Sequence, residues 1–254
     1  MKKVLLSGVA ILLAAPAVAA DLPTKKAPEL PVITEYDWTG FYFGGNLGGV
    51  WGHNSYNDYS TVTGLWTDGG SQNVSSFIGG GQAGYRYMFP QRFVIGAEAS
   101  LDWFSGSSHQ QAAYNFRTGA LSSEWSTYSS GWGGNVVGVA GYAWGDFLPF
   151  IKGGWAWSQA NVTHYQLYGT TGGLSAPPGA VAAGQPYSEV ASLSRGGWTI
   201  GGGLAYHFWS NWEVFGQYMY ANYGTGHVNY IALQRSTRTS LDTNAFTFGV
   251  NLKL

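Results

Sequence analysis

The chain has 254 residues, with 12 Lys and Arg against 13 Asp and Glu, a formal net charge of −1 and no cysteine. The lack of cysteine excludes a disulfide scaffold and a thiolate metal site, and the balanced charge leaves no basic footprint for nucleic acid. Only 10% of the residues are charged, whereas 17% are aromatic and 39 are glycine, which does not suit an ordinary soluble surface. The length is compatible with one all-β domain.

The first 20 residues have the pattern of a signal peptide. Lys2 and Lys3 supply a positive n-region, an apolar stretch follows over residues 4–15, and Ala17-Val18-Ala19 is an A-x-A cleavage site. A transmembrane anchor is the alternative, but this apolar run is too short and ends in small residues. No later stretch reaches about 18 consecutive apolar residues, so we expect no spanning helix. We therefore expect residues 1–20 to direct export and to be removed.

Residues 21–37 contain Pro23, Pro28 and Pro31 among charged residues and show no hydrophobic periodicity. Such a segment is typical of a flexible linker, so we predict a Pro-rich periplasmic lead-in. From residue 38 the pattern changes, and residues 38–254 are predicted to form one domain.

We predict eight β-strands in that domain, at residues 40–51, 76–89, 92–104, 132–144, 148–161, 196–208, 212–224 and 241–254. Three connections are short, and four are long and polar, at residues 52–75, 105–131, 162–195 and 225–240. This alternation is the layout of a small outer-membrane barrel. The predicted fold class is all-β, an eight-stranded antiparallel transmembrane up-and-down β-barrel. An even strand number places both termini at the short-turn, periplasmic end and the long loops outside the cell.

Alternation within the strands supports a barrel that faces lipid. In the third strand Phe93, Ile95 and Leu101 share one face, while Glu98 and Asp102 lie on the other. Aromatic residues also gather near strand ends, where two girdles are expected. Of these, we assign Trp38 to the periplasmic girdle and Tyr223 to the outer one. A soluble β-sandwich or lipocalin-like barrel is the alternative, but it does not explain why strand charges fall on the face of small residues.

The first strand also carries a family resemblance. Residues 37–49, DWTGFYFGGNLGG, resemble the opening strand of the small outer-membrane porin-like family of alphaproteobacteria, some members of which are surface immunogens or haemin-binding proteins. The AADLP junction at residues 19–23 and the GGQAGY pattern at residues 80–85 are similar to that family as well. The resemblance covers the mature chain and implies an eight-stranded barrel in the outer membrane. One departure is the C-terminal Leu254, where such barrels usually end in an aromatic residue that the assembly machinery reads.

Charged residues on the inward faces of the predicted strands should meet in the lumen. These residues are Arg86, Glu98, Asp102, Lys152 and Glu213. An eight-stranded barrel is just wide enough for side chains to fill it, and buried charges must be paired. We predict an interior ion network of Arg86, Glu98 and Lys152, with Arg86 and Glu98 in contact across adjacent strands. It can act as a gate for a narrow aqueous path or as a structural plug, and we favour the plug.

The four histidines at the predicted outer loops offer a weaker hypothesis. His53, His109, His164 and His227 fall one to each loop or its root. Imidazole is a common ligand of haem iron and divalent metals, so haemin is a speculative ligand, although solvated loop histidines are the commoner case. We expect no metal site and no catalysis, because the Ser/His neighbours at residues 53–55 and 107–109 lie in Ser-rich loops where adjacency arises by chance.

The sequence therefore predicts a structural protein of the outer membrane of a Gram-negative bacterium, displaying four long external loops, whose lumen conducts small solutes modestly at best. The alternative is a surface receptor or adhesin that binds haemin or a host partner through its loops. A lipid-modifying enzyme is a remote third. The expected partners are outer-membrane lipid and, during biogenesis, the barrel-assembly machinery, with no nucleic acid.

Overall fold

The computed structural model describes residues 36–61, 64–105, 108–111, 114–115, 120–121, 125–128, 131–167, 186–230 and 235–254. These residues belong to the compact unit Glu35–Leu254. The predicted signal peptide, and the predicted lead-in up to residue 35, lie outside the described residues. Over the ranges given, no helix is long and apolar enough to cross a membrane.

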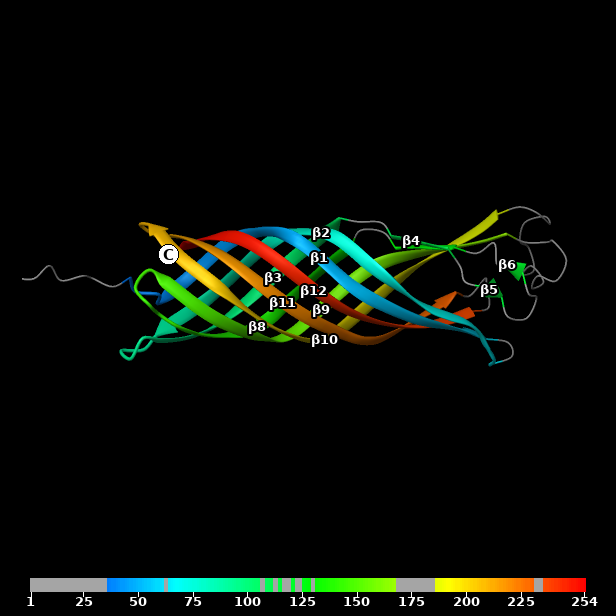
Figure 1. The fold of residues 1–254 in the computed structure, drawn as a ribbon, viewed down its shortest axis with the longest axis horizontal. Helices are drawn as coiled ribbons and strands as arrows, with labels where there is room; N and C mark the ends of the chain where they lie inside the picture. The colour runs from blue at the N-terminus through cyan, green and yellow to red at the C-terminus, as the bar shows by residue number, and fades with distance from the viewer. Residues whose placement is uncertain are drawn as a thin grey trace, which may run out of the picture. The chain divides into compact units, whose positions relative to one another are not determined.

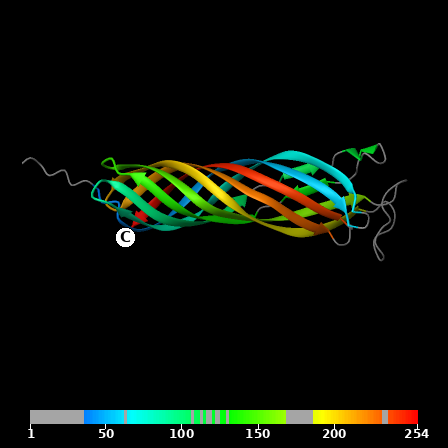
Figure 2. The same ribbon diagram turned by 90° about the horizontal axis from the view of Figure 1, so that it is seen from below.

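Eight long strands form a closed antiparallel ring (Figures 1 and 2). They are β1 (Gly40–Ser60), β2 (Trp66–Met88), β3 (Phe93–Ser105), β8 (Gly131–Tyr142), β9 (Phe147–Leu167), β10 (Pro186–Trp209), β11 (Trp212–Tyr230) and β12 (Arg235–Lys253). Each strand pairs with its neighbour along the chain, and β1 pairs with β12 to close the ring. The predicted eight-stranded up-and-down barrel is thus confirmed.

Four short strands extend the β3–β8 hairpin and lie between these two strands in the sequence. They are β4 (Ser108–Gln111), β5 (Tyr114–Asn115), β6 (Ala120–Leu121) and β7 (Trp125–Tyr128). β7 pairs with both β4 and the far end of β9, so the sheet continues beyond the ends of β3 and β8. β5 and β6 form a separate two-stranded sheet.

The strands run further than predicted at the end opposite the short turns. The predicted loop 52–75 is mostly strand, because β1 continues to Ser60 and β2 begins at Trp66. Likewise β11 continues to Tyr230 and β12 begins at Arg235. The prediction of four long loops was wrong in this respect, because it ended each strand where the outward residues stopped being apolar. The outward residues of these outer segments are largely polar, and their inward residues are still buried, as Asn54 and Asp58 show at 1% and 6% exposure.

The short connections gather at the other end, which we call the turn end. The first described residues and the C-terminus lie at this end too (Figure 1). In the β2–β3 turn the Arg92 amide donates to the Phe89 carbonyl at 2.8 Å, and Arg92 has a positive φ of 70°. Gly145, with φ 61°, occupies the β8–β9 turn. These contacts close tight reversals, as the short predicted connections require.

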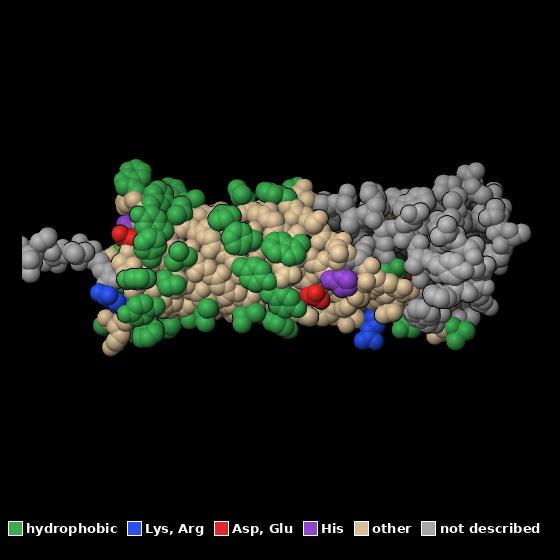
Figure 3. Space-filling model, in the orientation of Figure 1, with side chains coloured by type: hydrophobic (Ala, Val, Ile, Leu, Met, Phe, Trp, Pro, Cys, Tyr) green, Lys and Arg blue, Asp and Glu red, His purple; other side chains and the backbone are tan. Residues whose placement is uncertain are grey.

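The apolar face of the barrel points outward, as predicted. On β3 Phe93 and Leu101 are 58% and 54% exposed, whereas Val94 and Glu98 between them are almost fully buried. Apolar side chains crowd the turn end and continue over the middle of the barrel, and charged side chains lie at the turn end and again beyond the apolar ones (Figure 3). Two assignments to the aromatic girdles were wrong. Trp38 is fully buried at the turn end, and Tyr223 is 8% exposed and packs inside with Ala156.

Candidate functional site in the barrel lumen

Glycine on the inward face lets neighbouring strands approach closely. A Cβ built on Gly48 would lie 2.0 Å from the Phe246 carbonyl oxygen, and one on Gly201 would lie 2.1 Å from that of Tyr218. On the outward face, a Cβ on Gly49 would meet nothing within 4 Å. Inward glycine therefore keeps the barrel narrow and leaves room in the lumen for a limited set of large side chains.

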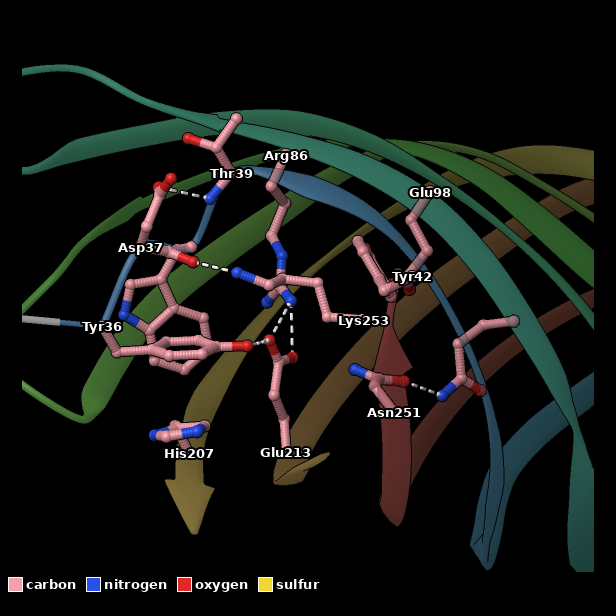
Figure 4. A network of polar contacts seen from close by, with 12 residues as sticks. Tyr36, Asp37, Thr39, Tyr42, Arg86, Glu98, His207, Glu213, Asn251 and Lys253 are labelled. Atoms are coloured by element: carbon pink, nitrogen blue, oxygen red, sulfur yellow. Dashed lines mark hydrogen bonds and ion pairs between the residues drawn. The ribbon is translucent and has the colours of Figure 1, made fainter. Parts of the chain in front are cut away.

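Arg86 and Glu213 form the first buried ion pair. Arg86 Nη2 lies 2.7 Å from Glu213 Oε1 and 2.5 Å from Oε2, and the two side chains are 4% and 0% exposed. The Tyr36 hydroxyl donates to Glu213 Oε1 at 3.1 Å. The Arg86 guanidinium also stands over the rings of Tyr42 and Trp38, at 4.2 and 5.1 Å from their centroids. Figure 4 shows this group from close by, with Glu213 accepting hydrogen bonds from both Arg86 and Tyr36.

Lys152 and Glu98 form the second buried pair. Lys152 Nζ lies 2.6 Å from Glu98 Oε1 and donates to Gln217 Oε1 at 2.8 Å. The Tyr42 hydroxyl donates to Glu98 Oε2 at 2.7 Å. Tyr42 therefore links the two pairs, because its ring lies under Arg86 while its hydroxyl holds Glu98.

The predicted contact between Arg86 and Glu98 is wrong. In the register of β2 and β3 Arg86 lies opposite Gly96, and Glu98 lies opposite Gly84, so the two are diagonal neighbours. Arg86 instead reaches across the lumen to form an ion pair with Glu213 on β11, and Glu98 forms its ion pair with Lys152 on β9. This exchange gives each of these four buried ions a partner of opposite charge, which a low-dielectric interior favours.

Asp102, the fifth predicted lumen residue, is held by neutral donors. Its Oδ2 accepts from the Ser100 hydroxyl at 2.7 Å, and its Oδ1 accepts from Asn46 Nδ2 at 3.0 Å. Asn46 Nδ2 also donates to Gln82, which in turn donates to Asn251 at 2.7 Å. The five charged residues are thus all buried, but only four of them form ion pairs.

An apolar cap closes the lumen at the turn end. Its buried members are Trp38, Val94, Val139, Ala143, Leu148, Phe150, Ala205 and Phe215. Trp38 precedes β1 and is anchored through Nε1, which donates to the Gly145 carbonyl at 3.4 Å. Sequence reasoning missed Trp38 as an inward residue, although it shares the parity of Tyr42 and Asn46. That parity was the available signal.

Tyr36 and Asp37, the last residues of the predicted lead-in, also contact the barrel. The Tyr36 ring stacks on His207 with centroids 3.7 Å apart, and Lys253 donates to the Asp37 carbonyl (Figure 4). Burial, and next the Glu213 carboxylate, raise the pKa of the Tyr36 phenol above its ordinary value. Tyr36 therefore stays protonated as a donor to Glu213.

The outer half of the lumen contains a polar cluster that the sequence did not indicate. Arg195 Nη1 and Nη2 donate to Asn54 Oδ1 and Thr239 Oγ1, at 3.3 and 3.0 Å. The Thr239 hydroxyl donates to Asn54 Oδ1 at 2.7 Å, and all three residues are at most 8% exposed. Arg195 is the last residue of the predicted loop 162–195, whereas in the structure it lies within β10 and points inward.

The predicted histidine group is not assembled where the structure describes it. His53 lies opposite Asp242 on β12, and His227 lies opposite Arg238, so four residues of β12 separate them. At about 3.4 Å per residue, that is roughly 14 Å along the strand, too far for one metal ion. The side chains of His109 and His164 lie outside the described residues. Across the described part of the chain, no group of three or more His, Cys, Asp or Glu could hold a metal.

Of the two Ser/His motifs, the structure describes the one at residues 53–55. The ring of His53 forms a hydrogen bond with Asn73 Oδ1, with Nδ1 and Oδ1 3.0 Å apart. Ser107 in the second motif lies outside the described residues.

A closed antiparallel ring with an apolar outer face and a polar lumen defines the class of transmembrane β-barrels. Comparison with known proteins gives the family, since residues 7–253 match the model described as outer membrane protein beta-barrel domain. The chain belongs to this family and is an outer-membrane protein.

Its relatives include the 31 kDa outer-membrane immunogenic proteins of Brucella melitensis and Brucella suis. Each is 30% identical over 241 residues, covering 88% of this chain and 88% of the relative. Among solved structures it is similar to Neisserial surface protein A, at 12% identity and a TM-score of 0.42, covering 85% of this chain and 98% of that one.

Proposed function

We propose that this protein is a structural barrel of the outer membrane that presents its long hairpins outside the cell and does not act as an open pore. In this orientation the turn end and both termini face the periplasm. The observation that carries the proposal is the filled lumen, in which an apolar cap, two ion pairs and the Arg195 cluster follow one another along the axis. We expect no enzymatic activity.

The energetics of the lumen favour a plug over a gate. A gate must break and re-form its contacts at low cost. Breaking a buried pair by removing one partner costs about 3–5 kcal/mol, and here Tyr42 couples two such pairs. The cap adds Trp38 and Leu148, both 0% exposed, which would have to leave an apolar environment.

Planar-bilayer recording of the purified barrel tests this proposal. We expect wild-type conductance close to that of a protein-free bilayer. Glu98→Ala should lower heat stability while leaving conductance unchanged, because the cap still closes the turn end. Trp38→Gly combined with Glu98→Ala should raise conductance. Steady wild-type channels that Glu98→Ala alone widens would contradict the plug and favour a gate.

Surface recognition is the second candidate, and the strand extensions favour it. β1, β2, β11 and β12 carry polar residues on their outward faces beyond the apolar band, including His53 and Arg238. The name of the Brucella relatives, outer-membrane immunogenic protein, is consistent with exposed hairpins. Titration with haemin tests one ligand: a Soret shift lost in His53→Ala or His227→Ala would support it, and an unshifted band would rule out haemin.

A further inference from the structure

A small cavity lies beside Asp102 in the middle of the lumen. It has a volume of about 60 Å³, and its lining includes Asn46, Asp102, Lys152, Gln217 and Thr247. Pockets for organic ligands usually measure roughly 300–1,000 Å³, so a sugar, amino acid or haem cannot fit. One water needs about 10–15 Å³, so the cavity accommodates an ion with a few waters.

The charges around this cavity do not balance. Among the residues that line it, Lys152 contributes one positive charge, and Glu98 and Asp102 contribute two negative charges, so the charged lining has a net charge of −1. The excess resides on Asp102, which is 6% exposed and has neutral hydrogen-bond donors. Lys152 interacts with Asp102 electrostatically, but its ammonium is bonded to Glu98 and Gln217.

Two residues that line the same cavity each have a buried side-chain oxygen with no hydrogen-bond partner among the described residues. These atoms are Thr247 Oγ1 and Asn46 Oδ1. Thr247 is 5% exposed, so bulk water does not satisfy its hydroxyl. An unpartnered buried polar group costs about 1–3 kcal/mol, and both oxygens can bind a cation.

We propose that this cavity binds one small monovalent cation, Na⁺, with oxygen ligands from Asp102, Asn46 and Thr247 and with water completing the shell. The cation neutralises the excess carboxylate and satisfies both free oxygens. A divalent ion fits poorly, because Ca²⁺ takes six to eight oxygen ligands, commonly several carboxylates, and Mg²⁺ dehydrates reluctantly. The Lys152 ammonium nearby opposes a double charge further.

Thermal unfolding of the purified, detergent-solubilised barrel tests the site. Na⁺ is varied against choline at constant ionic strength, and heat-modifiable gel mobility gives the midpoint. Because a ligand of the folded state stabilises it by mass action, we expect a rise of about 3–5 °C at a Na⁺ concentration ten times the dissociation constant. Equal midpoints in Na⁺ and choline would overturn the proposal.

Matched variants locate the effect. Asp102→Asn keeps the shape of the side chain and should abolish the Na⁺ shift, and Thr247→Val should weaken Na⁺ binding at least tenfold. Asp146→Asn removes a carboxylate outside the lumen and should keep the shift. Survival of the shift in Asp102→Asn would overturn the site. So would a midpoint that ignores Na⁺ but falls with rising pH in the wild type alone, because a proton on Asp102 would then supply the missing charge.

Discussion

Replacing Glu213 with alanine should destabilise the barrel more than any other single loss of charge in the lumen. Glu213 is 0% exposed and holds Arg86 Nη2 with both carboxylate oxygens. Its removal leaves the guanidinium, itself 4% exposed, without a counter-ion. Breaking a buried pair in this way costs about 3–5 kcal/mol. The Tyr36 hydroxyl loses its acceptor as well, which adds about 1 kcal/mol.

Equilibrium unfolding in urea, followed by tryptophan fluorescence in detergent micelles, measures this loss. Asp146→Asn is the control, because Asp146 pairs with His207 in an exposed position and should change stability little. The double variant Arg86→Met with Glu213→Leu should recover much of the loss, since it removes both charges and fills the space. If Glu213→Ala unfolds at the same urea concentration as Asp146→Asn, Arg86 does not depend on Glu213 and the reasoning is refuted.

Three further changes probe other parts of the barrel. Gly201→Ala should cost about 1–3 kcal/mol in the same urea assay, because its Cβ would overlap the neighbouring strand, whereas Gly49→Ala should be neutral or slightly stabilising; equal effects would contradict the close approach. Tyr36→Phe should cost about 0.5–1.5 kcal/mol, since Arg86 still holds Glu213, and a loss as large as that of Glu213→Ala would show that Tyr36 does more than donate. Arg195→Ala should lower the melting midpoint without opening conductance, because the cap lies elsewhere; a conducting Arg195→Ala barrel would place the seal in the outer half.

Parity along the strands predicted most of the fold. The two-residue period assigned Arg86, Glu98 and Lys152 to the lumen from the sequence alone, and their burial agrees with that assignment. Two residues were assigned to the wrong face because their parity was not used. Trp38 and Tyr223 were placed by their position near strand ends, although each has the parity of an inward neighbour. The parity of a residue along its strand therefore predicts whether it points inward better than its distance from the strand end does.

The sequence did not show which charged residues pair with one another in the lumen. Residues on adjacent strands are related by register, which hairpin turns fix, and that relation suggested Arg86 with Glu98. The observed partners, Arg86 with Glu213 and Lys152 with Glu98, come from strands that are not adjacent in the ring. Such contacts depend on the stagger and tilt of the closed ring, which local patterns do not encode. The outer ends of the strands lack an apolar outward face, so in the sequence they resemble loops.

The buried position of Trp38 has a consequence for the order in which the parts of the barrel fold. Trp38 precedes the first strand, yet it packs with Leu148, Ala205 and Phe215 from the second half of the chain, and the preceding residue Asp37 contacts Lys253 of the last strand. A half-built barrel cannot bury this indole, because most of its neighbours have not yet arrived. Bringing such distant segments together carries the largest loop-closure entropy in the chain. Burial of Trp38 is therefore a late event that coincides with closure of the β1–β12 seam, and the contacts of the same segment then hold that seam shut.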